Sequence, residues 1–134
     1  MCRTYVLAGL CAMCLLSAAM ARADRPVQKR EAATYVVSGT VQAVYVRETK
    51  GYREYIVELT IEQVGKGEGL QKRDCFRAFC YQRKQGAGGL EFDTAGHKTI
   101  PQEGQRVQVF VNRANGRNEG VYPDWVDVLQ NTKK

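Results

Sequence analysis

Apolar and polar side chains alternate through much of the chain after residue 33, and this alternation predicts β-strands. The clearest stretch covers residues 55–62, in which the apolar positions are Tyr55, Val57, Leu59 and Ile61. A period of two turns one face of a strand toward a core and the other toward solvent. Residues 104–113 repeat the pattern with three valines on one face, so they predict a second strand of this kind.

Three more segments are rich in β-branched and aromatic residues and are also predicted as strands. Residues 34–46 carry Gly39 near their middle, which predicts a bend or bulge there. Residues 74–83 form an aromatic-rich strand, and residues 121–129 form the last, where Pro123 predicts an edge position or an irregular start. No segment keeps a period of 3.6 over three turns, so little or no helix is expected in this part of the chain.

Glycine-containing segments separate the predicted strands. Turns are expected at residues 48–54, 65–69 and 114–120, the last because Asn115-Gly116 is a strong signal for a tight turn. Residues 84–104 are the least regular part of the chain. A connection of about twenty residues in a compact domain is unusual and often functional, so this loop is a candidate contact segment.

Five predicted strands, the first of them bent, indicate one all-β domain over residues 34–129. We expect a small five-stranded antiparallel barrel or a sandwich. The long bent first strand, the hairpin to a long second strand and the irregular connection after the third resemble an OB-fold. Four short motifs resemble those of small exported bacterial proteins, and this resemblance implies no activity: Gly96-His97, Pro101, Gly104-Gln105-Arg106-Val107 and Tyr122-Pro123-Asp124.

The first 23 residues are predicted to be a signal peptide. Arg3 precedes an uncharged apolar run over residues 5–20, and Ala21-Arg22-Ala23 has the small-x-small pattern of a cleavage site. The run is shorter than the about 20 residues that span a bilayer, so no membrane span is expected in the mature chain; an uncleaved anchor is the alternative. Cleavage near Ala23 would export the protein to the periplasm or the medium, with residues 24–33 as a flexible leader and 130–134 as a frayed tail.

Cleavage would change both the charge and the cysteine count. Because the segment contains two arginines and no acid, the net charge falls from +6 to +4, a scattered excess that favours anionic partners. Only Cys75 and Cys80 remain of the five cysteines. On a regular strand they would face opposite sides about 16 Å apart, whereas a disulfide needs Cα atoms within about 7 Å. A disulfide across a bend, two buried thiols and an intermolecular link therefore stay open.

The chain offers little catalytic chemistry, and we expect a protein without enzymatic activity. His97, the only histidine, is expected on the surface or in a turn, and nothing marks the orienting group that a Cys80–His97 nucleophile pair would need. Two cysteines and one histidine lack the spacing of a zinc site, so no metal or cofactor is expected. Asp124 and Asp127 would face opposite sides of a strand, so they are not expected to act as a carboxylate pair in acid–base catalysis.

Basic and aromatic side chains alternate along residues 74–83, and this is the one pattern in the sequence that predicts a binding surface. In OB-like barrels this strand belongs to the face that binds oligonucleotides or oligosaccharides. The opposite orientation, with Phe79 in the core and Phe76 outside, stays open because both faces carry aromatics. The predicted ligand-binding residues are Arg77, Tyr81, Arg83, Tyr52, Arg53 and Arg113.

These observations predict an exported, non-catalytic binding module. Its expected partner is an anionic ligand, such as an acidic glycan, or an envelope protein. A structural or assembly protein that acts through residues 84–104 and through open strand edges is the alternative. An enzyme that uses Cys80 or His97 is the remote alternative.

Overall fold

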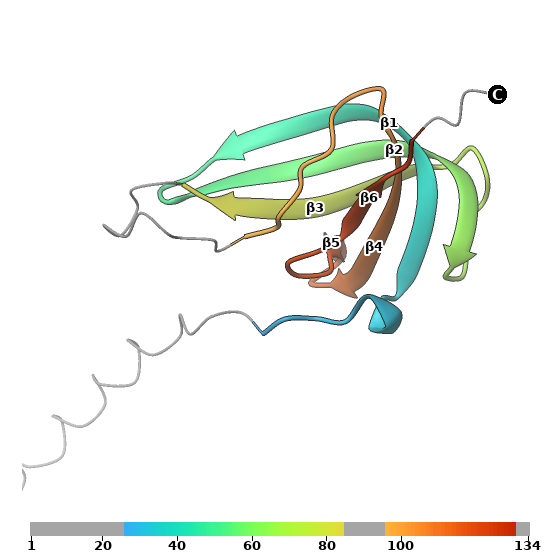
Figure 1. The fold of residues 1–134 in the computed structure, drawn as a ribbon, viewed down its shortest axis with the longest axis horizontal. Helices are drawn as coiled ribbons and strands as arrows, with labels where there is room; N and C mark the ends of the chain where they lie inside the picture. Colours follow the sequence, from blue (N-terminus) through green and yellow to red (C-terminus); the bar gives the residue numbers. More distant parts are fainter. Residues whose placement is uncertain (1–25, 85–95, 131–134) are drawn as a thin grey trace, which may run out of the picture.

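Six strands and one short 3-10 helix make up the described residues of the computed structural model, which are 26–84 and 96–130 (Figure 1). The predicted signal peptide, most of the predicted loop over residues 84–104 and most of the predicted tail lie outside these ranges. The elements are η1 (Arg30–Ala32), β1 (Tyr35–Glu48), β2 (Tyr52–Lys66), β3 (Cys75–Arg83), β4 (Arg106–Ala114), β5 (Arg117–Gly120) and β6 (Val126–Val128). The predicted all-β class is confirmed. No helix in the described ranges is long and apolar enough to cross a membrane.

The first five strands close into a barrel. They pair in the order β1-β2-β3-β5-β4, and β4 pairs back onto β1, while β6 adds to the free part of β4. This order is consistent with the expected OB-like barrel. One pair differs from the antiparallel expectation, because β3 and β5 run parallel where Phe79 meets Glu119. β5 follows β4 in sequence and runs antiparallel to it, so β5 has the same direction as β3.

The bend predicted in the first strand is present at Gly39. The register between β1 and β2 shifts between Ser38 and Gly39, and a side chain at position 39 would bring its Cβ to 2.1 Å from the Thr60 carbonyl oxygen. Residues 36–40 of β1 pair with both β2 and β4, whereas residues 43–48 pair with β2. The bend therefore lets one long strand close the barrel and then project beyond it as a β1–β2 hairpin.

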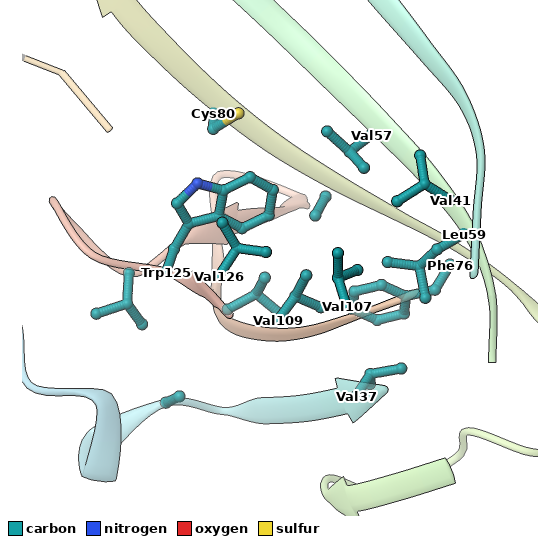
Figure 2. Packing of buried hydrophobic residues seen from close by; sticks show 14 of the residues in the cluster. Val37, Val41, Val57, Leu59, Phe76, Cys80, Val107, Val109, Trp125 and Val126 are labelled. Atoms are coloured by element: carbon teal, nitrogen blue, oxygen red, sulfur yellow. The ribbon is translucent and has the colours of Figure 1, made fainter. Parts of the chain in front are cut away.

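Alternate side chains of β2, β3 and β4, together with Val37 and Val41 of β1, fill the interior, as the period-two pattern predicts (Figure 2). Trp125, which lies just before β6, is fully buried and donates its indole N–H to the Thr99 carbonyl oxygen at 2.8 Å. Gly120 leaves room for this ring, because a Cβ there would lie 2.8 Å from the Trp125 Cδ2 atom. The predicted inward positions are all buried: Tyr55, Val57, Leu59, Ile61, Val107, Val109 and Val111.

The last barrel strand is not the one that the sequence predicts. Residues 117–120, expected within a turn, form β5 and pair with β4, whereas the predicted strand over residues 121–129 supplies only the three-residue β6. Asn115 and Gly116 form the predicted tight turn, both with positive φ, of 52° and 74°. Because of that turn, the chain becomes a strand again at Arg117, four residues before the start of the predicted strand at residue 121.

Residues 26–33, within the predicted leader over residues 24–33, lie against the barrel, and we call them the N-terminal strap (blue in Figure 1). The Gln28 N–H donates to the Tyr122 carbonyl oxygen at 2.8 Å, and Ala33 is fully buried. Two Arg30 nitrogens donate to both Asp127 oxygens, at 2.8 and 3.0 Å, and one also reaches Asp124 Oδ1 at 2.9 Å. The expectation that the Asp124 and Asp127 carboxylates face opposite sides of a strand is wrong, because Asp124 lies before β6 and does not follow its alternation.

Candidate ligand-binding groove

The structure decides which face of β3 points outward. Phe76, Ala78 and Cys80 are buried in the barrel, so the alternate residues, from Arg77 to Arg83, lie on the outer face. Phe79 is outward yet nearly buried, because the Arg117 guanidinium covers its ring at 3.6 Å from the ring centroid. The arrangement with basic and aromatic residues outside is therefore the one that occurs.

An apolar row crosses this outer face on three neighbouring strands. Tyr45 on β1 lies opposite Ile56 on β2, and Ile56 lies opposite Phe79 on β3. Tyr45 and Ile56 are 53% and 42% exposed, which is unusual for side chains of this size. The row forms the floor of an open surface with charged side chains on both sides.

A groove of about 540 Å³ lies over this row, between the projecting β1–β2 hairpin and the β4–β5 turn. Four arginines from four strands line it, and we call it the arginine groove. Arg47 comes from β1 and Arg77 from β3, while the Asn115-Gly116 turn brings Arg113 and Arg117 to the opposite side. The remaining lining residues are Tyr45, Val46, Glu54, Ile56, Ala78, Phe79, Gly116 and Asn118.

Positive charge exceeds negative charge in this lining, where Glu54 is the one carboxylate. Arg47 pairs with Glu54, and Arg77 donates from Nε to Glu58 Oε2 at 2.8 Å, a hydrogen bond that raises the pKa of Arg77. Arg113 has no carboxylate partner among the described residues and donates instead to the neutral Asn118 Oδ1 at 3.2 Å. The groove is therefore suited to a negatively charged group.

The six predicted ligand-binding residues do not form one site. Arg77 and Arg113 line the groove, but the others lie elsewhere on the barrel. Tyr81 is edge-on to Tyr52, with ring centroids 6.0 Å apart, and stacks on Tyr122 at 6.2 Å. Arg53 pairs with Glu48 at 2.8 Å, and Arg83 lies opposite Tyr52 on the neighbouring strand.

Two of the four groove arginines, Arg47 and Arg117, were not among the predicted ligand-binding residues. Tyr45 and Arg47 alternate at the end of β1, a pattern that could have marked an outward face. Ile56 falls on the predicted solvent face of its strand, where alternation alone gives it no role. Arg117 lies inside the turn predicted over residues 114–120, so its position beside Arg113 follows only if Asn115-Gly116 is taken as a hairpin turn that joins two strands.

His97 is buried rather than on the surface, with 2% of its area exposed. Its Nδ1 accepts the Tyr81 backbone N–H at 3.1 Å, so Nε2 carries the proton and donates to the Gly120 carbonyl oxygen at 2.9 Å. The ring also packs edge-on against Trp125, with centroids 6.0 Å apart. Both nitrogens are thus engaged in joining β3 to the end of β5, which fits a structural role.

The two cysteines are free, and the disulfide left open by the sequence is not formed. Both lie on β3, which pairs without a break with β2 from Cys75 to Arg83, so no bend brings their side chains together. Cys75 is exposed and Cys80 is buried. Burial raises the pKa of the Cys80 thiol well above its ordinary value, which opposes the thiolate that a nucleophile needs.

The described ranges contain no cluster of three or more His, Cys, Asp or Glu side chains able to hold a metal ion. Comparisons with family models, curated proteins and solved structures found no match to this chain. The interpretation of the groove therefore rests on its own geometry and charge.

Proposed function

We propose that this protein is an exported binding module and that its arginine groove binds an anionic ligand, of which an acidic glycan is the class that fits best. The observation that carries the proposal is the convergence of four guanidinium groups over an apolar row. The role is binding rather than catalysis, because the groove lining combines cationic and apolar side chains without a nucleophile beside a base.

The arginines support an anionic ligand for a geometric reason. A guanidinium group presents a planar set of donors that matches a carboxylate or sulfate in two parallel hydrogen bonds. The Arg47 and Arg77 side chains are 74% and 67% exposed, so a ligand carboxylate can reach their guanidinium groups beside the less exposed Glu54 and Glu58. Arg113 donates to a neutral partner instead of a glutamate.

The floor of the groove supports a sugar ring. Tyr45 presents a half-exposed ring beside Ile56, and such surfaces pack against the apolar faces of sugars. The groove is open and bounded by a hairpin and a turn, a shape that admits an extended chain rather than enclosing a small molecule. An acidic oligosaccharide uses both features, since it combines ring faces with regularly spaced carboxylates.

Titration calorimetry with uronic acid oligomers tests this assignment, using the matched variants Arg77→Gln and Arg106→Gln. Each arginine pairs with a glutamate of β2, Glu58 or Glu62, but only Arg77 lines the groove. We expect Arg77→Gln to weaken binding by about tenfold, as for loss of a charge-assisted hydrogen bond, and Arg106→Gln to leave it unchanged.

Two controls separate specific binding from general attraction between charges. Neutral oligomers of the same length should bind at least about tenfold more weakly than the acidic ones if the arginines select the ligand. Equal loss of affinity in Arg77→Gln and Arg106→Gln would show that only net charge matters. No binding of acidic oligomers at millimolar concentration would reject the glycan and leave an envelope protein as the partner to examine.

A further inference from the structure

The second half of β1 has an open edge. Residues 35–40 pair with β4, and Val41 still exchanges backbone hydrogen bonds with Gln105 and Gly104. From residue 43 to residue 48 the strand pairs with β2 alone, and within the described ranges no backbone group lies bonded to its other side. An open edge of this kind can accept another strand.

The hydrogen-bond pattern identifies which backbone groups face outward. Thr49 and Tyr52 exchange both of their backbone hydrogen bonds, at 2.9 and 3.4 Å, and no register shift occurs between Ala43 and Glu48. In an antiparallel pair such exchanges recur at every second residue, so Ala43, Tyr45 and Arg47 direct their N–H and C=O groups toward β2. The intervening residues, Val44, Val46 and Glu48, therefore direct theirs to the open edge.

The middle of this edge is apolar and exposed. Tyr45 and Val46 are 53% and 55% exposed, and the next residue inward, Val44, is an apolar side chain packed against the core. Natural proteins usually block such an edge with a charged residue or a proline at its centre. Here the charges of Arg47 and Glu48 come only at its end.

We propose that this edge pairs with the same edge of a second copy of the chain, antiparallel and with the two-fold axis at Tyr45. In this register Tyr45 faces its own copy in a non-hydrogen-bonded pair, where cross-strand side chains lie closest. Val44 then faces Val46 on each side of the axis, and both use outward backbone groups. The exposed Val46 is thereby covered by an apolar neighbour.

Charge complementarity favours this register over its neighbours. With the axis at Tyr45, Arg47 faces the small Ala43 of the second copy, whose own neighbour on β2 is Glu58. Glu48 faces Gln42, so no like charges meet. An axis at Arg47 would place two arginines directly opposite each other, which is destabilising.

The expected interface is small. An edge of about six residues buries less than the roughly 1,200 Å² of a standard stable interface, so the dimer should dissociate in the micromolar range or above. A two-fold axis perpendicular to the sheet also keeps both outer faces on one side. The second copy would therefore extend the sheet across the axis, with both arginine grooves facing the same way.

Sedimentation equilibrium from about 1 µM to about 1 mM tests the proposal on the mature protein, without the predicted signal peptide. We expect a monomer–dimer equilibrium whose dissociation constant rises at least tenfold in Val46→Lys. Val27→Lys is the matched control, since Val27 is also an exposed valine, 75% exposed, but lies in the strap. A monomer throughout this range, or a dimer unaffected by Val46→Lys, would overturn the proposal.

Cross-linking gives a second and independent measurement. In a Cys75→Ser background, Tyr45→Cys should form a disulfide-linked dimer under mild oxidation, because the axis brings the two introduced thiols together. Val27→Cys in the same background should stay monomeric. Circular dichroism and thermal unfolding confirm that each variant is folded, and equal cross-linking of both variants would contradict the register.

Discussion

Cys75 and Cys80 show how strongly one strand can separate the chemistry of two identical residues. Cys75 points outward and is exposed, whereas Cys80 lies in the core across from Tyr55. The thiol of Cys80 stays protonated because burial raises its pKa, and the barrel offers it only packing contacts. Of the two cysteines in the described ranges, Cys75 is therefore the accessible one.

The raised pKa of Cys80 predicts a loss of stability in alkali. The unfolded thiol ionises from about pH 9, its ordinary value, while the folded one stays protonated. The folded state then binds more protons, so its free energy of unfolding falls as pH rises, by up to about 1.4 kcal/mol per pH unit from this group. Urea unfolding at pH 8, 9 and 10 should show a steeper decline for the wild type than for Cys80→Ala.

Thiol labelling checks the same assignment without unfolding the protein. At pH 8 a thiol reagent should modify Cys75 rapidly and Cys80 only after urea is added. Equal labelling rates for the two cysteines in the native protein would contradict the burial of Cys80.

Side-chain positions within a strand could be predicted from the sequence, but contacts between strands could not. The period-two pattern places Val57 and Val109 in the core correctly, because alternation is a local property. The burial of His97 depends on Tyr81, Gly120 and Trp125, which come from other parts of the fold. No local pattern carries that information.

Elements with an apolar face were predicted, and elements without one were missed. β2 and β4 follow directly from their alternation, whereas β5 has the sequence Arg-Asn-Glu-Gly and resembles a turn. It becomes a strand because the Asn115-Gly116 turn returns it along β4, where Gly120 pairs with Val111. Its strand character is thus set by pairing rather than by propensity.

One arginine joins the N-terminal strap to the residues around β6. The Arg30 guanidinium binds Asp124 and Asp127 and lies 4.5 Å from the Phe110 ring centroid. We expect Arg30→Ala to lower the free energy of unfolding by about 1–2 kcal/mol, a range that allows for partial exposure. Arg30→Lys should restore only part of the loss, because an ammonium group cannot bridge both carboxylates in one plane.

Chemical denaturation measures this effect, and Lys29→Ala is the matched control. Lys29 is exposed next to Arg30 and has no side-chain hydrogen bond among the described residues, so its loss should change stability by less than about 0.5 kcal/mol. If Arg30→Ala were as mild as Lys29→Ala, the strap would contribute no stability through this contact.

At the scale of the whole molecule, closure of the barrel creates the groove. Arg47 and Arg117 are far apart in sequence and line one groove only because the strand order β1-β2-β3-β5-β4 places the β1–β2 hairpin on one side of β3 and the β4–β5 turn on the other. The sequence places Arg77 and Phe79 on one face of β3, since that follows from alternation, but it leaves open whether that face points outward. Arg113 was also predicted as a ligand-binding residue, but Arg47 and Arg117 were not, because their proximity to Arg77 follows from the strand order.

Export is the prediction that concerns the whole chain. The strap contacts the barrel from Gln28 onward, so cleavage after Ala23 would leave every contact of the strap intact. We expect the protein outside the cytoplasm to begin at Asp24, which cell fractionation and intact mass measurement would check. Deletion of residues 2–23 should keep the protein in the cytoplasm with an unchanged unfolding temperature, because the described barrel and strap remain. A membrane-bound product that retains residues 1–23 would instead support the uncleaved anchor.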